Sequence, residues 1–241
     1  MIEKPLTSNV YEAAQIIKAA KNKKIIIKLG YNLRSLESLK KIKKIIKIKK
    51  LGKIYSVKAE AGKYLPDWRK LNYTKTVSAN KILGGGVVSE LSHEIDYLFW
   101  IFGKFNNVFC KLNRISNLKI NVEDSADIIF FKRKSFSINL SLDFCRRDSV
   151  RKCYIACERG SLLWDGILNQ VKIYKKKWSI IKIEKKDISQ TYLAQLKIFF
   201  KLVKSNNALN TNLASLKDGY YVVKTIKALF KSSKLSTAVS I

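Results

Sequence analysis

Two short segments carry side chains that could transfer protons. Lys4 lies between Glu3 and Pro5, and His93, the sole histidine, follows the glycine triplet 84–86. A lysine can act as a base when burial and positive neighbours lower its pKa, because desolvation disfavours the ammonium form. A lone histidine on an apolar helix is usually a satisfied core residue, but a glycine turn lets backbone approach a ligand closely. Both segments are therefore candidates for general acid–base chemistry.

Further polar and aromatic residues accompany these segments. Asp96 follows His93 by three positions and falls on the same helical face, where it could orient the imidazole or bind substrate. The alternative for Asp96 is an acid on the helix surface. Trp68 and Arg69 could stack on and hydrogen-bond a sugar or a nucleotide-sugar phosphate, or they could simply anchor a loop.

Four motifs occur in a fixed order along the chain: Glu3-Lys4-Pro5, the turn 30–34 (GYNLR), the segment 62–69 (GKYLPDWR) and the run 84–96 (GGGVVSELSHEID). This series resembles the Gfo/Idh/MocA family of NAD(P)-dependent sugar and inositol oxidoreductases. Segment 62–69 resembles the loop of a subgroup associated with bacterial surface-sugar pathways. The resemblance extends from residue 2 to about residue 105 and continues more loosely to the C-terminus. Each motif alone is weak, and their order and spacing carry the resemblance.

The resemblance implies a role for each matching residue. It makes Lys4 the base at the sugar hydroxyl, next to a cis Lys4–Pro5 peptide, and makes His93 the residue that shares that hydroxyl or relays its proton. The family usually has an aspartate just before the histidine, whereas the nearest acid that precedes His93 here is Glu90, three positions earlier. We expect Glu90 and Asp96 to bind substrate. The expected cofactor is NAD or NADP, and the residues expected to bind it are Glu3, Pro5, Tyr31, Asn32 and Arg34.

The dinucleotide-binding fingerprint of the family is not found in the 241 residues. A complete member has a βαβ unit whose G-x-G-x-x-G turn holds the pyrophosphate, and residues 84–86 lack both that spacing and a preceding buried strand. We therefore expect residues 1–50 to be the remnant of a Rossmann domain and residues 51–241 to form a substrate and oligomerisation domain. The chain could be a gene fragment, one half of an enzyme with a separately encoded Rossmann half, or a non-catalytic remnant or scaffold module.

Hydrophobic periodicity predicts a mixed α/β (α+β) fold with a β-rich region framed by helices, and the family resemblance implies that the sheet is open and mostly antiparallel. Residues 53–61 alternate as a strand should, as do residues 136–142 within a region of at least four strands between 107 and 183. A buried parallel strand is expected over 24–29, and 64–83 reads as a long loop. Helices are expected over 7–21, with Thr7 or Ser8 as the cap, and over 35–50, 87–102, 190–204 and 213–232.

The charge of the chain suggests a rival function. Lys+Arg total 48 against 18 Asp+Glu, a net charge of +30, and clustered cations bind nucleic acid. However, 40 of the 48 are lysines accompanied by much Ile and Asn, which indicates A- and T-rich codons, whereas groove readers favour arginine. A nucleic-acid partner is therefore disfavoured. The best features of this rival are the lysine-rich segment 40–50 and the run 175–177 beside Trp178.

The remaining composition predicts a cytoplasmic protein. The four cysteines have no zinc or disulfide spacing, so we expect reduced thiols and no bound metal. The N-terminus has no secretory pattern, and no apolar stretch is long enough to span a bilayer. The expected ligand is a sugar or nucleotide sugar, and a homo-oligomer is expected from the family resemblance.

Overall fold

A nine-stranded sheet dominates the computed structural model, which describes residues 1–23, 25–183, 188–205 and 211–241. Within these residues the strand order is β11-β3-β4-β5-β2-β6-β7-β8-β9, and every neighbouring pair is antiparallel except β2 and β5. This arrangement confirms the expected open, mostly antiparallel sheet. The strands are β2 (Ile54–Gly62), β3 (Asn107–Asn113), β4 (Ser125–Phe131), β5 (Ile138–Asp143), β6 (Val150–Cys157), β7 (Gly160–Asp165), β8 (Gln170–Tyr174), β9 (Trp178–Ile181) and β11 (Val239–Ser240).

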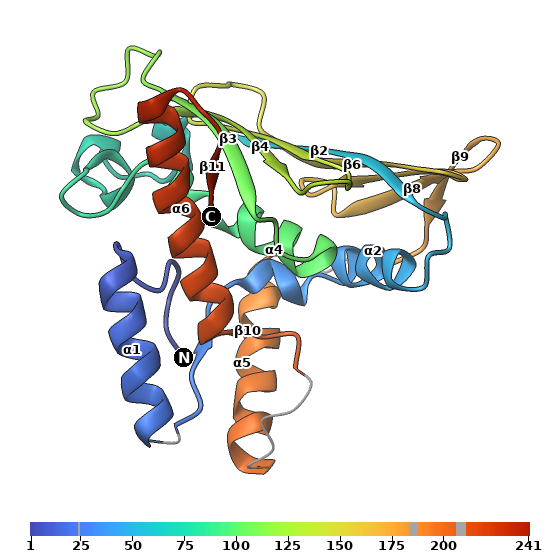
Figure 1. Cartoon of the computed structure of the whole chain (residues 1–241), viewed down its shortest axis with the longest axis horizontal. Coiled ribbons are helices and arrows are strands. Elements are labelled where there is room, and N and C mark those ends of the chain that lie inside the picture. Colours follow the sequence, from blue (N-terminus) through green and yellow to red (C-terminus); the bar gives the residue numbers. More distant parts are fainter. Residues whose placement is uncertain (24, 184–187, 206–210) are drawn as a thin grey trace.

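Helices cover one face of this sheet, as Figure 1 shows for α2, α4 and α6. Alternate strand residues supply the covered face, because successive side chains of a strand point to opposite sides. Val57, Ala59 and Ala61 of β2 are buried there, as the alternation of 53–61 predicts. The helices are α1 (Val10–Lys23), α2 (Glu37–Lys47), α3 (Val87–Glu90), α4 (Ser92–Phe102), α5 (Ile188–Ser205) and α6 (Leu216–Leu235).

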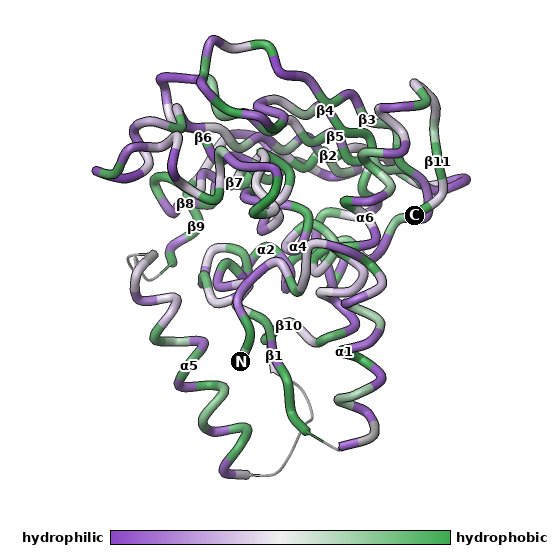
Figure 2. Tube along the Cα trace, turned by 90° about the vertical axis from the view of Figure 1, so that its left-hand side faces the viewer, coloured by the Kyte–Doolittle hydropathy of each residue, from purple (hydrophilic) through white to green (hydrophobic). Residues whose placement is uncertain are grey.

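A separate two-stranded ribbon lies between α1 and α5 (Figures 1 and 2). Strand β1 (Lys28–Leu29) pairs antiparallel with β10 (Ala214–Ser215), and Ile2 adds a single parallel bridge to Leu29. The expectation of a buried parallel strand over 24–29 is wrong in its length and in its main pairing, and residue 24 lies outside the described residues. The physical reason is that Ile25 is 53% exposed, so only the end of this apolar run is covered.

Local capping shifts several expected helix ends. Helix α1 begins at Val10, because the Asn9 side chain accepts a hydrogen bond from the Glu12 amide at 2.9 Å, so neither Thr7 nor Ser8 is the cap. The expected helix over 87–102 is two helices separated at Leu91. Helix α6 begins at Leu216, where Ser215 and Asp218 form a reciprocal capping box.

The long loop before α3 contains three short 3-10 turns, at Leu65–Trp68, Tyr73–Lys75 and Val77–Ala79. Their brevity explains why the sequence shows no clear period between 64 and 83. The loop lies beside the N-terminal segment and the start of α3, and it therefore helps to shape the site described next.

Candidate active site around Lys4 and His93

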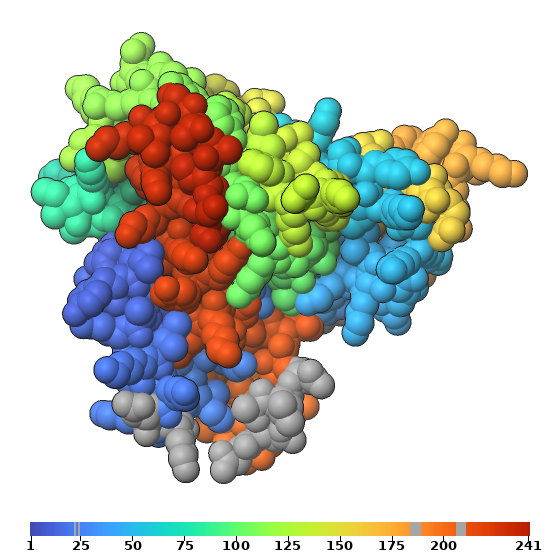
Figure 3. Space-filling view, in the orientation of Figure 1, coloured from blue at the N-terminus to red at the C-terminus, as the bar shows by residue number. Residues whose placement is uncertain are grey.

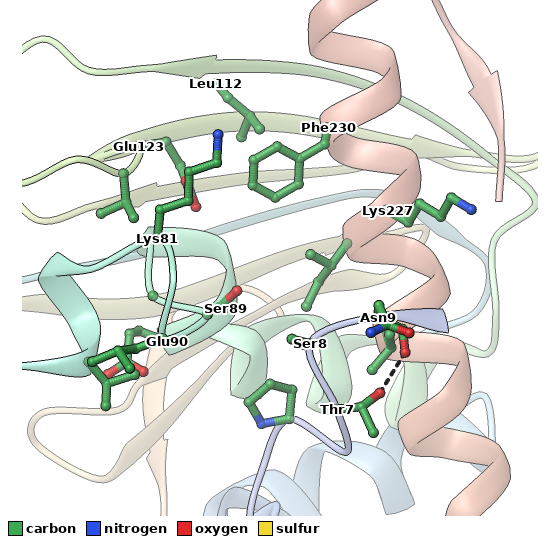
Figure 4. Close-up of a pocket in the computed structure, with 18 of the residues that line it drawn as sticks. Thr7, Ser8, Asn9, Lys81, Ser89, Glu90, Leu112, Glu123, Lys227 and Phe230 are labelled. Atoms are coloured by element: carbon green, nitrogen blue, oxygen red, sulfur yellow. Dashed lines mark hydrogen bonds between the residues drawn. The ribbon is translucent and has the colours of Figure 1, made fainter. Parts of the chain in front are cut away.

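A groove of about 1270 Å³ opens beside Lys4. Its walls come from the N-terminal segment, the loop 77–85 with α3, the end of β3, the segment 121–123 and one side of α6, as Figure 4 shows for Asn9, Lys81, Glu90, Glu123 and Phe230. The fold therefore assembles the groove from five separate pieces of chain.

Lys4 is held in place by a hydrogen bond, which its Nζ donates to the backbone oxygen of Glu90 at 2.8 Å. The Lys4–Pro5 peptide is cis, as the resemblance implies. Burial lowers the pKa of Lys4, and this lowering persists although Glu90 and Glu3 favour the ammonium form. Arg69 adds to the lowering. Lys4 is therefore suited to accept a proton.

His93 lies on α4, with its ring edge-to-face against Tyr31 at 5.6 Å between centroids. Its Nδ1 atom is buried and has no hydrogen-bond partner among the described residues. Burial lowers the pKa of His93 well below its ordinary value, and the positive charges of Lys4 and Arg151 add to this effect. The imidazole is therefore neutral at neutral pH, and the effect of the Lys4 charge on its pKa links the two side chains into one electrostatic unit.

Glu90 joins this unit through its backbone and its side chain. Its carboxylate accepts a hydrogen bond from Ser78 Oγ at 2.7 Å, and together with Ser89 it lines the groove. Sequence reasoning missed Ser78, because the loop that holds it has no periodic pattern. The position of Glu90 leaves its carboxylate beside the space where a ligand of Lys4 would lie.

The glycine triplet before α3 makes room for protein atoms. A Cβ on Gly85 would lie 2.0 Å from the Val77 carbonyl oxygen, and one on Gly86 would lie 2.3 Å from Glu123 Oε1. Gly86 also has a φ of +108°, which disfavours other residues. The close backbone approach expected at the triplet is thus to the neighbouring loop and to Glu123, while Gly84 and Gly85 also line the groove.

A buried ion pair that sequence reasoning missed lies next to His93. Glu94 is 0% exposed, and its Oε1 lies 2.9 Å from Arg151 Nε. Arg151 comes from β6, directly opposite Ala61 of β2. An acid in the middle of an apolar helix is a signal that could have indicated a buried cationic partner. The identity of that partner, Arg151, follows only from the register between β2 and β6.

Asp96 is buried in a second ion pair, so the interpretation of Asp96 as a surface acid is wrong. Arg34 donates to both carboxylate oxygens, Nε to Oδ2 at 2.8 Å and Nη2 to Oδ1 at 2.6 Å, and its Nη1 lies 3.4 Å from Asp218 Oδ2. Bidentate pairs of this kind fix geometry as well as charge. The network ties the turn after β1 to α4 and α6, and Asp96 thereby positions the helix that carries His93.

The other residues of the 30–34 turn are also internal. Tyr31 and Asn32 are each 2% exposed, and Asn32 Nδ2 donates to Thr191 Oγ1 of α5 at 2.8 Å. Glu3 is exposed and lies against Gly30, where an added Cβ would come within 3.0 Å of Glu3 Oε2. The structure therefore brings Glu3, Lys4 and Pro5 together at the surface and encloses Tyr31, Asn32 and Arg34.

Trp68 anchors its loop. Its Nε1 donates to the Lys63 carbonyl at 2.9 Å, and its ring packs edge-to-face on Phe144 at 5.1 Å between centroids. Arg69 is exposed, and its charge reaches Lys4. Of these two expected substrate residues, Arg69 therefore has the side chain available to a ligand.

Residues 39–163 match the GFO/IDH/MocA C-terminal domain. The chain belongs to the Gfo/Idh/MocA family. Oxidoreductase P35 of Formosa agariphila is 24% identical to this chain over 183 residues, which cover 72% of this chain and 54% of the relative. The chain thus spans about half the length of the curated relative that it matches.

Solved structures of Gfo/Idh/MocA-type dehydrogenases share the whole described fold. The apo form of levoglucosan dehydrogenase has a TM-score of 0.87 at 16% identity, covering 100% of this chain and 73% of its own. The aldose-aldose oxidoreductase of Caulobacter crescentus, complexed with glycerol, has 0.86 at 16% identity, with 100% and 71% coverage. An inositol dehydrogenase homolog of Azotobacter vinelandii, complexed with NAD⁺, has 0.86 at 12% identity, with 100% and 72% coverage.

No helix of the described residues is long and apolar enough to cross a membrane. No group of three or more His, Cys, Asp or Glu side chains among them is arranged to hold a metal ion.

Proposed function

We propose that this chain forms the substrate and proton-transfer side of an NAD(P)-dependent oxidoreductase that acts on a hydroxyl of a sugar or nucleotide sugar. The observation that carries the proposal is Lys4, which lines the groove, has its pKa lowered by burial and, through its charge, lowers the pKa of His93. Oxidation of a secondary hydroxyl needs a base that accepts its proton, and a lowered pKa favours the neutral form of both side chains.

Each residue has a defined task in this proposal. Lys4 Nζ, aimed by its bond to the Glu90 carbonyl, accepts the hydroxyl proton and becomes an ammonium group. His93 shares the hydroxyl or relays the proton, while the Glu90 carboxylate accepts a hydrogen bond from a neighbouring sugar hydroxyl. Exposed Arg69 binds an oxygen or a phosphate of the substrate.

The nicotinamide cofactor supplies the hydride acceptor when it is bound. Glu3 and Pro5 flank Lys4 and fit the nicotinamide end of such a cofactor. The rest of the cofactor has no matching cradle among the described residues, because Tyr31, Asn32 and Arg34 are committed to internal contacts and no G-x-G-x-x-G turn occurs in the sequence. We therefore propose that a separately encoded Rossmann half completes the site, with residues 1–50 as its continuation and 51–241 as the substrate domain. A homo-oligomer of the completed enzyme stays a prediction.

A chimera tests the proposal directly. The Rossmann half of levoglucosan dehydrogenase would be fused ahead of residue 1, and NAD-dependent oxidation of levoglucosan and a panel of sugars and nucleotide sugars would be measured. Lys4→Met should lower kcat by roughly 100- to 10,000-fold with a modest change in KM, because a base acts mainly in the transition state.

The matched control is Lys18→Met, which removes an exposed lysine of α1 and should leave turnover unchanged. Normal turnover of the Lys4→Met chimera would exclude Lys4 as the base. A wild-type chimera that binds NADH but oxidises none of the substrates would contradict the proposed function as a whole.

A further inference from the structure

A trench lined by lysines runs between α2 and the β8–β9 hairpin. Figures 1 and 3 show that these elements lie on the opposite side of the molecule from α1. The first part of the trench, of about 430 Å³, has Lys41, Lys44 and Lys50 on one side and Lys175 on the other. A second part, of about 320 Å³, shares Lys41 and Lys44 and adds Lys182 from the hairpin strand end. The two parts thus form one continuous trench.

The trench arises from two segments that are far apart in the sequence. Helix α2 buries Leu39 and Ile42 on its inner face, so the lysines on its adjacent side point along the hairpin. The floor between the two walls is aliphatic and includes Ile45 and Ile181. The lysine-rich segment 40–50 therefore faces Lys175, the first residue of the run 175–177, although the two segments are far apart in the sequence.

The charge on this trench is almost entirely positive. Glu37 is the only acidic residue that lines it in the described part of the chain, and its carboxylate is bound by Lys40 Nζ at 2.8 Å. No ion pair joins Lys41, Lys44 or Lys175 to a carboxylate of the described residues. A row of uncompensated cations on two facing walls attracts a linear anion.

We propose that the trench binds single-stranded nucleic acid without sequence preference. Two observations select this partner. The site is concave with charges on two walls, whereas a flat acidic membrane would contact only one. The lysines on the α2 side run from Lys40 to Lys50, so the charged wall is longer than a single phosphate group.

This inference is independent of the oxidoreductase site and departs from the expectation that nucleic acid is disfavoured. That expectation rests on the excess of lysine over arginine, which groove readers favour. Lysines without arginines still suit contact with a phosphate backbone, since such contacts position a strand and read no bases.

Fluorescence anisotropy with a labelled oligouridylate tests the proposal on the full chain. The triple variant Lys41→Gln, Lys44→Gln, Lys175→Gln should weaken binding by at least about tenfold at about 50 mM salt. It should also lower the log–log salt slope by about 2, because each lost phosphate contact removes roughly 0.7 for a single strand. The matched control Lys18→Gln, Lys21→Gln, Lys231→Gln removes the same charge from α1 and α6 and should weaken binding less than about threefold.

Equal losses in the two triple variants would show that binding follows net charge alone, and would overturn the proposal. Unchanged binding of the oligonucleotide by the trench variant would also overturn it. So would a wild-type chain that does not bind the oligonucleotide but binds phosphatidylglycerol vesicles through the trench lysines. Circular dichroism and the Tm of each variant verify folding. As a second measurement on the wild type, the oligonucleotide should protect Lys41, Lys44 and Lys175 from acylation but leave Lys18 and Lys21 reactive.

Discussion

The candidate chemistry depends on two basic side chains whose pKa values are lowered in a strongly cationic protein. Burial is the main cause for both Lys4 and His93, and nearby arginine charge adds to it. Arg151 can stand so close to them because buried Glu94 holds its Nε. A single cation thus serves both the packing of α4 and the protonation state of the site.

The protonation state of His93 is directly measurable, because the chain has one histidine and hence one imidazole spectrum. Its pKa is lowered, so the ring should stay neutral and its NMR signals constant well below the ordinary midpoint near pH 6.5. Lys4→Met removes a positive neighbour and should raise this midpoint, whereas Lys18→Met should not. A wild-type midpoint near 6.5 would contradict the burial of the ring.

At the scale of elements, the buried Arg34–Asp96 pair joins the turn after β1 to α4. The pair is enclosed, with side-chain exposures of 7% and 1%, so each charge depends on the other. Asp218 contributes from α6, where it also completes the capping box with Ser215. Three elements from different parts of the chain are therefore joined by this one ion-pair network.

Breaking this pair should destabilise the whole fold. Asp96→Asn leaves a buried guanidinium without its main partner and should lower the free energy of unfolding by about 3–5 kcal/mol in urea titrations. The double variant Arg34→Met, Asp96→Leu should recover most of the loss, because neither charge remains. A loss below about 1 kcal/mol, typical of surface pairs, would show that water reaches the pair.

At the scale of the whole molecule, the described residues assemble a groove beside Lys4, whereas the sequence contains no G-x-G-x-x-G turn for a pyrophosphate. In the proposed function, the contacts to the pyrophosphate come from a Rossmann half.

This incomplete site predicts that the 241-residue chain alone binds NADH weakly or not at all. A nicotinamide-fluorescence titration measures this, with levoglucosan dehydrogenase, which has been solved in complex with NADH, as the positive control. An affinity in the micromolar range for this chain would mean that a cofactor cradle exists without the glycine fingerprint.

The sequence by itself determined the features that repeat or that stand next to each other in the chain. Alternation in 53–61 and 136–142 predicts strands, because a strand with one covered face repeats every two residues. The order of the motifs around Lys4 and His93 likewise indicates the family. Helix ends were less predictable, since a cap such as Asn9 depends on single hydrogen bonds.

Only the tertiary structure decided which distant residues meet. Arg151 reaches Glu94 because of the register between β2 and β6, and Asp96 is buried because Arg34 arrives from another element. Lysines of 40–50 and Lys175 line one trench for the same reason. Periodicity indicates whether a side chain is buried, because it depends only on neighbours in the chain. Which charged residues lie next to that side chain depends on how the elements pack in space.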